Sequence, residues 1–390
     1  MAIQFKPNCC FNSLILKEHF KTLYGYNYEF PVDCINLINI YYLRLRDGHQ
    51  ILGCDYDRSS IITKIGLFHM GYNEFIFSNY IKKINIDNVL SVSTSTWTIL
   101  ILATHGLYCF NRNDSNSIEK INIDNVKSMS IGNLDALILN TDGLFRMRGV
   151  CLKNIDLIRI DIDNVQSVKS GSYHHLILCN DELYGLGDNK FGQLRTYNAE
   201  EIENPIKLNI KNVIDYSCGD NHNLALCIYG LYMWGYNCTN KNRLGKLPNN
   251  FHKINIDNVL AIYSGGDHNM ILCTDGIYSF GKNYYGQLGL GDYEDRIVPC
   301  KIDIDINVNR IISIGCGLRH TIIMTDNDLL YGFGDNTYSQ LGKEIINNHK
   351  DHINEITYSF PQKVDINNWP DTYYGIIKSW VTKISFLFSR

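Results

Sequence analysis

The sequence predicts an all-β fold, a single seven-bladed β-propeller built from four-stranded antiparallel blades. Three observations predict it: a repeat whose equivalent positions lie 37 to 53 residues apart, short apolar runs within each repeat, and turn residues between those runs. The chain has 390 residues, of which 45% are hydrophobic and 19% are charged. A chain of this length and composition buries a substantial core.

The first part of the repeat is a phrase of the type Lys-Ile-Asn-Ile-Asp-Asn-Val, as in residues 253–259. Its leading position recurs at Lys83, Lys120, Arg159, Lys207, Lys253, Lys301 and Lys363. The phrase also repeats an Asp, at Asp87, Asp124, Asp163 and Asp257. We expect these carboxylates to cap their own turns, because Asx side chains bond nearby backbone groups and catalytic Asp residues do not occur in sets of four.

The second part is a Gly-x-x-His turn, which supplies His174, His222, His268 and His320. The equivalent places in the other repeats are Arg58, Thr98 and Asp135. Equivalent positions of separate blades are farther apart than the roughly 2 Å ligand distances of a shared zinc ion allow. We therefore expect these rings to bond backbone groups of the tight turn. We expect no catalytic, cofactor-binding or metal-binding residues.

The third part is an apolar run, a turn and an aromatic residue. Runs such as residues 99–102 and 176–179 are short and rich in branched side chains, as in strands buried on both faces. Asp142-Gly143 and Asp275-Gly276 are pairs that supply positive φ to a two-residue hairpin. A helical repeat would need about 10 to 12 residues with a period of 3.6 in each half, and none is present. The aromatic positions are Phe68, Tyr108, Phe145, Tyr184, Tyr232, Tyr278 and Tyr331.

Three later repeats continue with a Gly-x-Asn-x-x-Gly-Gln-Leu-Gly type of segment, at residues 187–194, 281–289 and 334–342. Together with the Gly-x-x-His turn and the Asp-Gly hairpin, this segment resembles the regulator of chromosome condensation repeat family. The match is close for these three repeats, fair for the repeat with Trp234, and weak before residue 120. The first three repeats are about ten residues shorter, so we expect their outer strands to be abbreviated or differently built.

The resemblance implies a propeller that binds proteins through one face. Family members that act as exchange factors bind a small GTPase with the help of an inserted β-wedge, and the middle repeats here show no such insertion. The one sizeable insertion covers residues 343–362.

Seven leading phrases and seven hairpins occur, but they are offset by one. The first hairpin lacks a clear leader, and the phrase at residues 363–366 has no following hairpin. We therefore predict that a C-terminal strand completes the first blade and closes the ring, a closure that the family resemblance also implies.

The ends of the chain lie outside the repeat. We expect residues 1–35 to form an N-terminal extension with a short helix over 12–24, residues 36–369 to form the propeller, and residues 370–390 to form an amphipathic tail. The tail is interpreted as packing onto the propeller, with a membrane or partner helix and a strand pair as alternatives.

Composition limits the classes of function and location. The net charge of −4 does not favour a nucleic-acid partner, although a local basic face is compatible with it. The 13 cysteines include no Cys-x-x-Cys pair, and the sequence has neither a signal-peptide pattern nor a membrane-spanning run, so we expect an intracellular protein, cytoplasmic or nuclear. The 52 Ile and 44 Asn beside 6 Ala indicate an AT-rich genome, such as that of a large DNA virus.

These observations predict a non-catalytic protein-interaction scaffold that binds a protein partner through one propeller face and holds no cofactor. No nucleophile elbow, phosphate-binding loop or zinc-protease helix is present, so we do not expect an enzyme. Two alternatives follow from the resemblance: guanine nucleotide exchange on a Ran-like small GTPase, and chromatin or DNA binding in a genome-organising protein.

Overall fold

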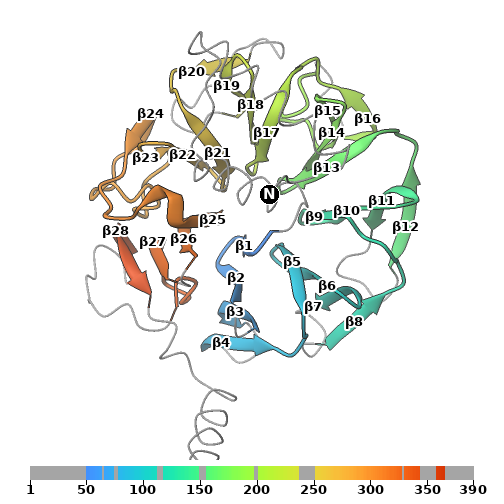
Figure 1. Cartoon of the computed structure of the whole chain (residues 1–390), viewed down its shortest axis with the longest axis horizontal. Coiled ribbons are helices and arrows are strands. Elements are labelled where there is room, and N and C mark those ends of the chain that lie inside the picture. Colours follow the sequence, from blue (N-terminus) through green and yellow to red (C-terminus); the bar gives the residue numbers. More distant parts are fainter. Residues whose placement is uncertain are drawn as a thin grey trace, which may run out of the picture. The chain divides into compact units, whose positions relative to one another are not determined.

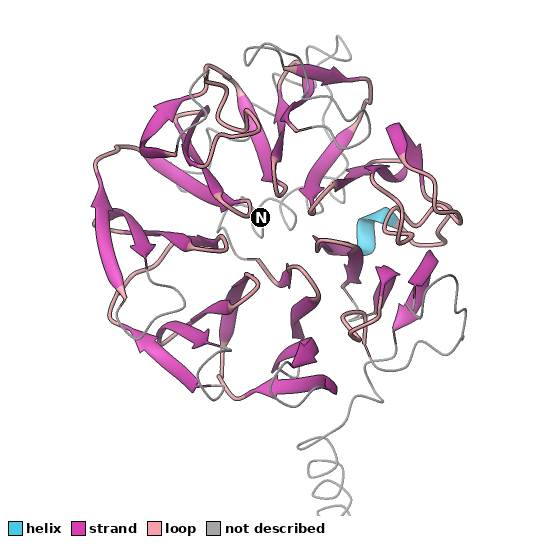
Figure 2. Cartoon of the chain, turned by 180° about the vertical axis from the view of Figure 1, so that it is seen from behind, coloured by secondary structure: helices cyan, strands magenta, loops and turns pink. Residues whose placement is uncertain are grey.

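The computed structural model describes residues 50–63, 66–73, 78–111, 117–148, 155–196, 201–236, 251–326, 329–342 and 357–364. These residues form seven four-stranded antiparallel sheets that follow one another around a ring (Figure 1). The prediction of an all-β, seven-bladed propeller is confirmed. Within the described ranges, the structure contains one short helical turn, η2 (Val308–Arg310), drawn in cyan in Figure 2.

Blades 1 to 3 are formed by consecutive stretches of the chain. Blade 1 contains β1 (Leu52–Cys54), β2 (Arg58–Thr63), β3 (Gly66–Asn73) and β4 (Ser78–Ile84). Blade 2 contains β5 (Val89–Thr94), β6 (Thr98–Ala103), β7 (Gly106–Asn111) and β8 (Ser117–Ile121). Blade 3 contains β9 (Ser128–Ile131), β10 (Asp135–Asn140), β11 (Gly143–Arg148) and β12 (Asp156–Ile160).

Blades 4 to 7 follow the same plan. Blade 4 contains β13 (Val165–Ser170), β14 (His174–Cys179), β15 (Glu182–Gly187) and β16 (Ile202–Lys207). Blade 5 contains β17 (Val213–Cys218), β18 (His222–Cys227), β19 (Gly230–Gly235) and β20 (His252–Ile254). Blade 6 contains β21 (Val259–Ser264), β22 (His268–Cys273), β23 (Gly276–Gly281) and β24 (Arg296–Lys301). Blade 7 contains β25 (Ile311–Cys316), β26 (His320–Thr325), β27 (Leu330–Asp335) and β28 (Thr357–Val364).

The four strands of a blade, called A to D in chain order, run from the centre of the ring outward (Figure 1). Neighbouring strands are antiparallel, so the AB turns and CD connections lie on one face of the propeller, which we call the AB face. The BC turns and the connections from strand D to the next strand A lie on the opposite face, which we call the BC face.

The BC turns differ in detail from the predicted Asp-Gly hairpin. In blade 6, Cys273 pairs with Gly276, so Thr274 and Asp275 are the two loop residues and the glycine is the first paired residue of strand C. Gly276 has a φ of 157°, and a Cβ there would lie 2.5 Å from Cε of Lys301 on strand D. Glycine is favoured at this position because other residues rarely adopt this φ, whereas the end of the flexible Lys301 side chain could move aside.

The leading phrases are the outer strands of the preceding blades, not the first strands of the following ones. Lys253 and Ile254 pair with strand C of blade 5, and the phrase then crosses to strand A of blade 6. In this crossing the residue with left-handed backbone is the Asn after the repeated Asp: φ is 51° at Asn88, 54° at Asn125, 57° at Asn164 and 56° at Asn258. Asn tolerates this conformation better than most residues, which explains the recurrent Asn.

This assignment corrects the predicted ring closure. Lys363 and Val364 belong to β28, which pairs with β27 of blade 7, while blade 1 obtains its innermost strand from β1. Each described blade is thus a contiguous stretch of chain, and the offset between phrases and hairpins arises because each phrase follows its own hairpin. The ring closes by packing of blade 7 on blade 1: Leu52, Ile61 and Met70 share one buried cluster with Ile322 and Tyr358.

The core is distributed between the blades. Buried clusters combine side chains of blades 1 and 2, 2 and 3, 3 and 4, 4 and 5, 5 and 6, and 7 and 1. Continuous apolar B strands such as Leu224–Leu226 contact both neighbouring sheets, as expected for strands buried on two faces.

The first three blades are shorter because they lack the Gly-Gln-Leu-Gly type of segment, which lies between strands C and D of the later blades. Their outer strands are present, so the expectation of abbreviated outer strands is wrong. The difference lies in the CD connections: β3 and β4 are separated by residues 74–77, whereas β23 and β24 are separated by residues 282–295.

The expected helix over 12–24 and the tail at 370–390 lie outside the described residues. Of the predicted insertion at residues 343–362, residues 357–362 belong to strand β28, so the insertion does not end before that strand, and residues 343–356 lie outside the described ranges. In the part of the chain that is described, no helix has the length and apolar character needed to cross a membrane.

Candidate functional site

The seven AB turns gather around the centre of the AB face and form a structure that we call the turn ring (Figure 2). It consists of residues 55–57, 95–97, 132–134, 171–173, 219–221, 265–267 and 317–319. Each turn directly precedes strand B of its blade, so the Gly-x-x-His motif spans the turn and the first residue of that strand.

A closed series of hydrogen bonds connects the turns. Backbone N–H groups donate across four junctions: Asn133 N to Ser172 O (2.8 Å), Asp220 N to Gly266 O (3.2 Å), Gly266 N to Gly317 O (3.1 Å) and Leu318 N to Asp55 O (3.1 Å). Side chains donate across the other three: Arg58 Nη1 to Thr96 O (2.8 Å), Thr96 Oγ1 to Asn133 Oδ1 (3.1 Å) and Ser172 Oγ to Asp220 Oδ1 (2.7 Å). Every turn is therefore fixed to both of its neighbours.

The glycine of the Gly-x-x-His turn is required by this close contact. A Cβ at Gly219 would lie 2.6 Å from the carbonyl oxygen of Gly265 in the next blade and 2.1 Å from Cε1 of His222 in its own blade. Gly265 is crowded in the same way, by Gly317 O at 2.4 Å and by its own His268. The glycine leaves space for the neighbouring backbone and for the histidine ring.

The four turn histidines are fully buried, and Nε2 of each forms a hydrogen bond with a side chain of the next blade. The partner is the residue after the equivalent position of that blade: Asn223 Oδ1 for His174 (2.7 Å), Asn269 Oδ1 for His222 (2.8 Å), Thr321 Oγ1 for His268 (2.8 Å) and Ser59 Oγ for His320 (2.8 Å). The prediction that these rings bond backbone groups of their own turn is therefore wrong, because Nε2 of each ring bonds a side chain of the neighbouring blade. The rings connect neighbouring blades.

The direction of these bonds follows from the acceptors. Thr321 Oγ1 donates its own proton to Gln287 O at 3.0 Å, so it accepts from His268. Asn223 likewise donates its amide to Gln193 O at 2.9 Å and uses its oxygen for His174. Burial lowers the pKa of His174 to about 4 and that of His268 to about 3, so both rings are neutral near pH 7.

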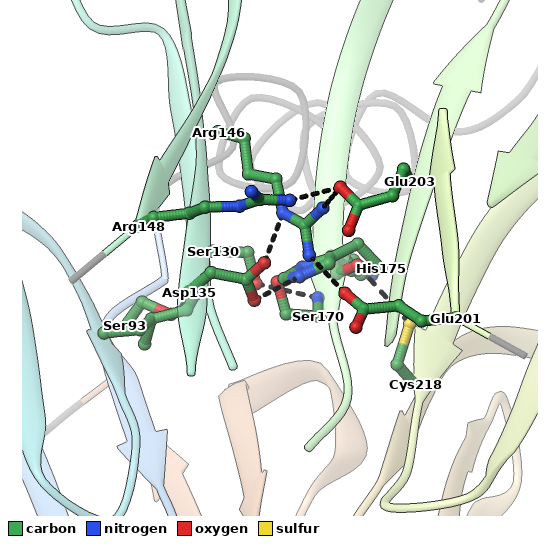
Figure 3. A network of polar contacts seen from close by, with 12 residues as sticks. Ser93, Ser130, Asp135, Arg146, Arg148, Ser170, His175, Glu201, Glu203 and Cys218 are labelled. Atoms are coloured by element: carbon green, nitrogen blue, oxygen red, sulfur yellow. Dashed lines mark hydrogen bonds and ion pairs between the residues drawn. The ribbon is translucent and has the colours of Figure 1, made fainter. Parts of the chain in front are cut away.

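Blade 3 makes the same connection with its chemistry reversed. Asp135 occupies the histidine position and accepts from Nε2 of His175, the residue that follows the equivalent position in blade 4, at 2.7 Å. Figure 3 shows this pair inside a larger polar network: Arg146 contacts Asp135 at 2.5 Å, and its guanidinium also reaches Glu201 at 3.0 Å and Glu203 at 3.2 Å. Burial alone would raise the pKa of Asp135, but His175 and Arg146 hold it well below its usual range.

Asp135, His175 and Ser170 are joined in the manner of a nucleophilic triad, with Ser170 Oγ 2.7 Å from His175 Nδ1 (Figure 3). Two observations indicate that this series of three side chains has a structural role and not a catalytic one. Arg146 shares the Asp135 carboxylate, and the place of His175 is taken by Asn223, Asn269 and Thr321 at other junctions. An Asp–His–Ser line that follows a repeated junction position is explained by the junction.

The glycine-rich segments of blades 4, 6 and 7 are loop scaffolds. A buried Asn accepts from the backbone N–H five residues later: Asn189 from Leu194 (2.7 Å), Asn283 from Leu288 (2.9 Å) and Asn336 from Leu341 (2.9 Å). The Gln of the same segment accepts from the N–H two residues earlier, at Gln193, Gln287 and Gln340. These contacts account for the Asn, the Gln and the buried Leu of the motif.

The outward side chains of the turn ring were missed by sequence reasoning, which concentrated on the Gly and His of the motif. Exposed apolar residues follow one another over the first four blades: Tyr56 is 51% exposed, Leu134 is 70% exposed, Tyr173 is 46% exposed, and Trp97 is half-buried. The third turn position is apolar in blades 2 to 4 and polar in the other four blades, where it is Asp57, Asn221, Asp267 and Arg319. Tyr56 and Leu318 stand at the second turn position of blades 1 and 7. These residues could have been found in the sequence, because they occupy the two variable positions between the Gly and the His of the motif.

In architecture the protein is a seven-bladed β-propeller, with no metal-binding group of three or more His, Cys, Asp or Glu side chains among its described residues. Comparison with family models shows which propeller repeat it carries. Residues 180–226 and 275–324 match the model of the regulator of chromosome condensation (RCC1) repeat, and a second model of this repeat matches residues 259–287 and 311–340. The chain thus contains regulator of chromosome condensation repeats in blades 4 to 7.

Curated relatives share only part of this chain. The ultraviolet-B receptor UVR8 of Arabidopsis thaliana is 40% identical over 82 residues, which are 20% of this chain and 18% of the relative. The probable E3 ubiquitin-protein ligase HERC4 of Homo sapiens is 47% identical over 62 residues, 15% of this chain and 6% of that protein. The matches therefore span less than one fifth of the length of either relative.

Solved structures support the fold over most of the chain. Prp20p of Saccharomyces cerevisiae, whose structure is reported with its binding to Gsp1p and histones, aligns with a TM-score of 0.64 at 15% identity, covering 85% of this chain and 90% of that one. Human WBSCR16 aligns with a TM-score of 0.60 at 18% identity, covering 71% and 88%. At this level of identity the likeness concerns the fold alone.

Proposed function

We propose that this propeller is a non-catalytic interaction scaffold whose partner protein docks on the turn ring of the AB face. The observation that carries the proposal is the row of exposed apolar side chains on the turns of blades 1 to 4, which includes Leu134 and Tyr173. Tyr and Trp are enriched where proteins bind one another, since they offer large contact areas with few rotatable bonds.

The buried polar groups beneath this surface support a scaffold over an enzyme. The turn histidines and the Asp135–His175 pair are bonded across blade junctions, and burial keeps His268 and His320 neutral. Groups that hold the ring together in this way are poorly placed to exchange protons with a substrate. The eight described cysteines are free thiols, which agrees with the proposed intracellular setting.

The proposal is tested by site-specific photocrosslinking in the native cell. A crosslinking residue at position 134 is expected to trap a defined partner, whereas the same residue at position 229 is expected to trap none of it. Tyr229 is the matched control because it is 67% exposed and follows strand B of blade 5 on the BC face. Equal crosslinking of the same partner from both positions would contradict docking on the AB face.

Exchange on a small GTPase is the alternative that the repeat family suggests. Support for it is limited to the fold that this chain shares with Prp20p, described with its binding to Gsp1p. Nucleic-acid binding is less favoured by the turn ring, which carries Asp55, Asp57, Asp220 and Asp267 against one Arg and no Lys.

A further inference from the structure

The outer edges of the seven blades are built in two ways. In blades 4, 6 and 7, strand D shifts its register against strand C, and a proline stands two residues before the lysine of the leading phrase, at Pro205, Pro299 and Pro361. In blade 5, strand D has only three residues. Prolines, bulges and short strands are features that keep an edge strand from pairing with another chain.

Blades 1 to 3 lack these protective features. Their D strands, β4, β8 and β12, have seven, five and five residues without a proline. Each pairs with strand C in one continuous register. Among the described strands, each is also the outermost of its sheet (Figure 1). The regular backbone of these three edges suits the addition of a further strand.

The pairing of strands C and D shows which backbone groups of β8 face outward. In blade 6, the residue after Lys301 bonds inward, with Ile302 N donating to Ile277 O at 2.9 Å. Ile121 holds the same place after Lys120 in blade 2. Residues of an antiparallel strand bond alternately to one side and to the other. The N–H and C=O of Lys120, and of the residue two places before it, therefore face the outer edge.

That second residue is Ile118, which stands where blades 4, 6 and 7 have proline. The side chains of Ile118 and Lys120 lie on one side of blade 2, because they pair with Phe110 and Tyr108, which pack in the cluster between blades 1 and 2. Ile118 is 40% exposed. Its side chain and that of Lys120 therefore lie at the outer rim of the junction between blades 1 and 2.

The strands at this rim present cations without carboxylates. Lys82 of β4 lies 5.6 Å from the ring centre of Phe110, on the same side of blade 2 as Lys120. Both lysines are exposed, and neither forms an ion pair with a described residue. Strands β3, β4 and β7 contain no Asp or Glu, and Glu119 of β8 pairs with Cys109, which packs toward blade 3. A segment that adds to this edge is therefore favoured if it is acidic.

We propose that β8 binds an extended acidic segment of a partner protein as a fifth strand of blade 2. The segment forms main-chain hydrogen bonds with Ile118 and Lys120, places an apolar side chain opposite Ile118, and directs carboxylates to Lys120 and Lys82. This surface is separate from the turn ring. The proposal goes beyond the scaffold function proposed above, since it does not depend on docking at the AB face.

The test begins with a random twelve-residue peptide display library selected on the whole chain. The expected result is a set of peptides in which Asp or Glu alternates with apolar residues. Binding of one selected peptide is measured by fluorescence polarisation, together with two forms of it that are N-methylated on alternate residues, one on the odd and one on the even positions. Because an added strand bonds β8 through only one of its edges, one form should bind at least about tenfold more weakly and the other within about twofold.

Variants of the chain locate the binding. Ile118→Pro gives blade 2 the proline of blades 4, 6 and 7 and should weaken binding at least about tenfold, whereas Ile118→Ser keeps the N–H and should cost less. Lys82→Gln with Lys120→Gln should weaken binding about tenfold and reduce its dependence on salt. Lys301→Gln changes the equivalent lysine of blade 6 and is the control, with no change expected. Thermal melting establishes that each variant is folded before binding is compared.

The outcomes separate strand addition from other modes of binding. Equal binding of the two N-methylated forms, or equal effects of Ile118→Pro and Ile118→Ser, would overturn the fifth strand. Selected peptides that are basic or neutral would overturn the acidic partner. If Ile118→Pro does not fold, the N-methylated pair and the lysine variants decide the same question.

The outcomes also separate this inference from the scaffold proposal. A library that yields no peptide weakened by the changes at Ile118, Lys82 and Lys120 would overturn the site on β8. Peptides weakened instead by Leu134→Ser with Tyr173→Ser would overturn it while leaving docking on the turn ring intact. Peptides that depend on β8 and are unaffected by that double variant would support the fifth strand, whatever position 134 crosslinks.

Discussion

Blades 1 to 3 and blades 4 to 7 build the same junctions with different chemistry. In the later blades a buried neutral His donates to the next blade, whereas in blade 3 a carboxylate accepts from His175, and in blade 1 Arg58 donates to Thr96 O. All seven blades have the same order of four antiparallel strands even though the side chains that link them differ. Packing between sheets and closely spaced turns therefore fix the blade, and several polar pairs can satisfy the junction.

The largest expected effect comes from crowding the turn ring at a glycine. Gly219→Ala places a Cβ against Gly265 O and His222, so we expect a loss of more than about 4 kcal/mol in the free energy of unfolding, or no folded protein. The comparison is Ser95→Gly, since blade 2 already holds a side chain at this position and should lose less than about 1 kcal/mol. Urea unfolding measures both, and equal losses would show that the two halves of the ring are built alike.

Removal of the reversed link in blade 3 should have the next largest effect. Asp135→Ala leaves Arg146 and His175 without their shared carboxylate, and breaking a buried ion pair in this way costs about 3 to 5 kcal/mol. Glu203→Ala is the control, because Glu203 contacts Arg146 from a side chain that is 58% exposed. A loss below about 1 kcal/mol for Asp135→Ala would contradict the link.

A single histidine link in the later blades should matter less. His268→Ala removes one buried hydrogen bond to Thr321, and we expect unfolding to become easier by about 1 to 3 kcal/mol. His252→Ala changes an exposed histidine and should be neutral. Elemental analysis of the wild-type chain should find no stoichiometric zinc or copper. Bound metal lost from the His268 variant would assign the rings to a metal site.

The histidines also give the two halves of the ring a different response to acid. Their folded pKa values, about 4 for His174 and about 3 for His268, lie below the unfolded value near 6.5, so the unfolded chain binds more protons. Their contribution to stability is complete above pH 6.5 and decreases as the pH falls below it. His268→Gln should reduce this dependence by up to about 1.4 kcal/mol per pH unit, measured between pH 6 and 5. An unchanged slope would indicate a ring that titrates normally.

The smallest expected effect is on nucleotide exchange. Blades 4 to 7 match the regulator of chromosome condensation repeat, but the proposed docking row lies on blades 1 to 4, so we expect no acceleration of nucleotide release from a Ran-type GTPase. A fluorescent nucleotide reports the release. Stimulation by substoichiometric amounts of the propeller would favour the exchange function over the scaffold.

The number of blades was predictable because the repeat recurs as whole phrases. The B strands were predictable because each is a short, continuous apolar run. The point at which one blade ends and the next begins was not predictable. The Lys-Ile-Asn-Ile-Asp-Asn-Val phrase forms the last strand of one blade and the connection to the next, and the sequence pattern is equally compatible with the start of a blade. The partners of the histidines were also hidden. Asn223 and Thr321 look like ordinary strand residues until the ring brings them opposite His174 and His268. The row of exposed apolar side chains on the turn ring was not predictable, because its members come from separate turns that only the fold brings together.

The contiguous blades give the propeller a mechanical weak point. Six junctions are spanned by the chain, but blade 7 meets blade 1 through noncovalent contacts, among them Leu318 to Asp55 and His320 to Ser59. A force that pulls residue 50 away from residue 364 therefore loads this seam first, while the other junctions share the load through their backbone. We expect blades 7 and 1 to separate first, while both blades are still folded.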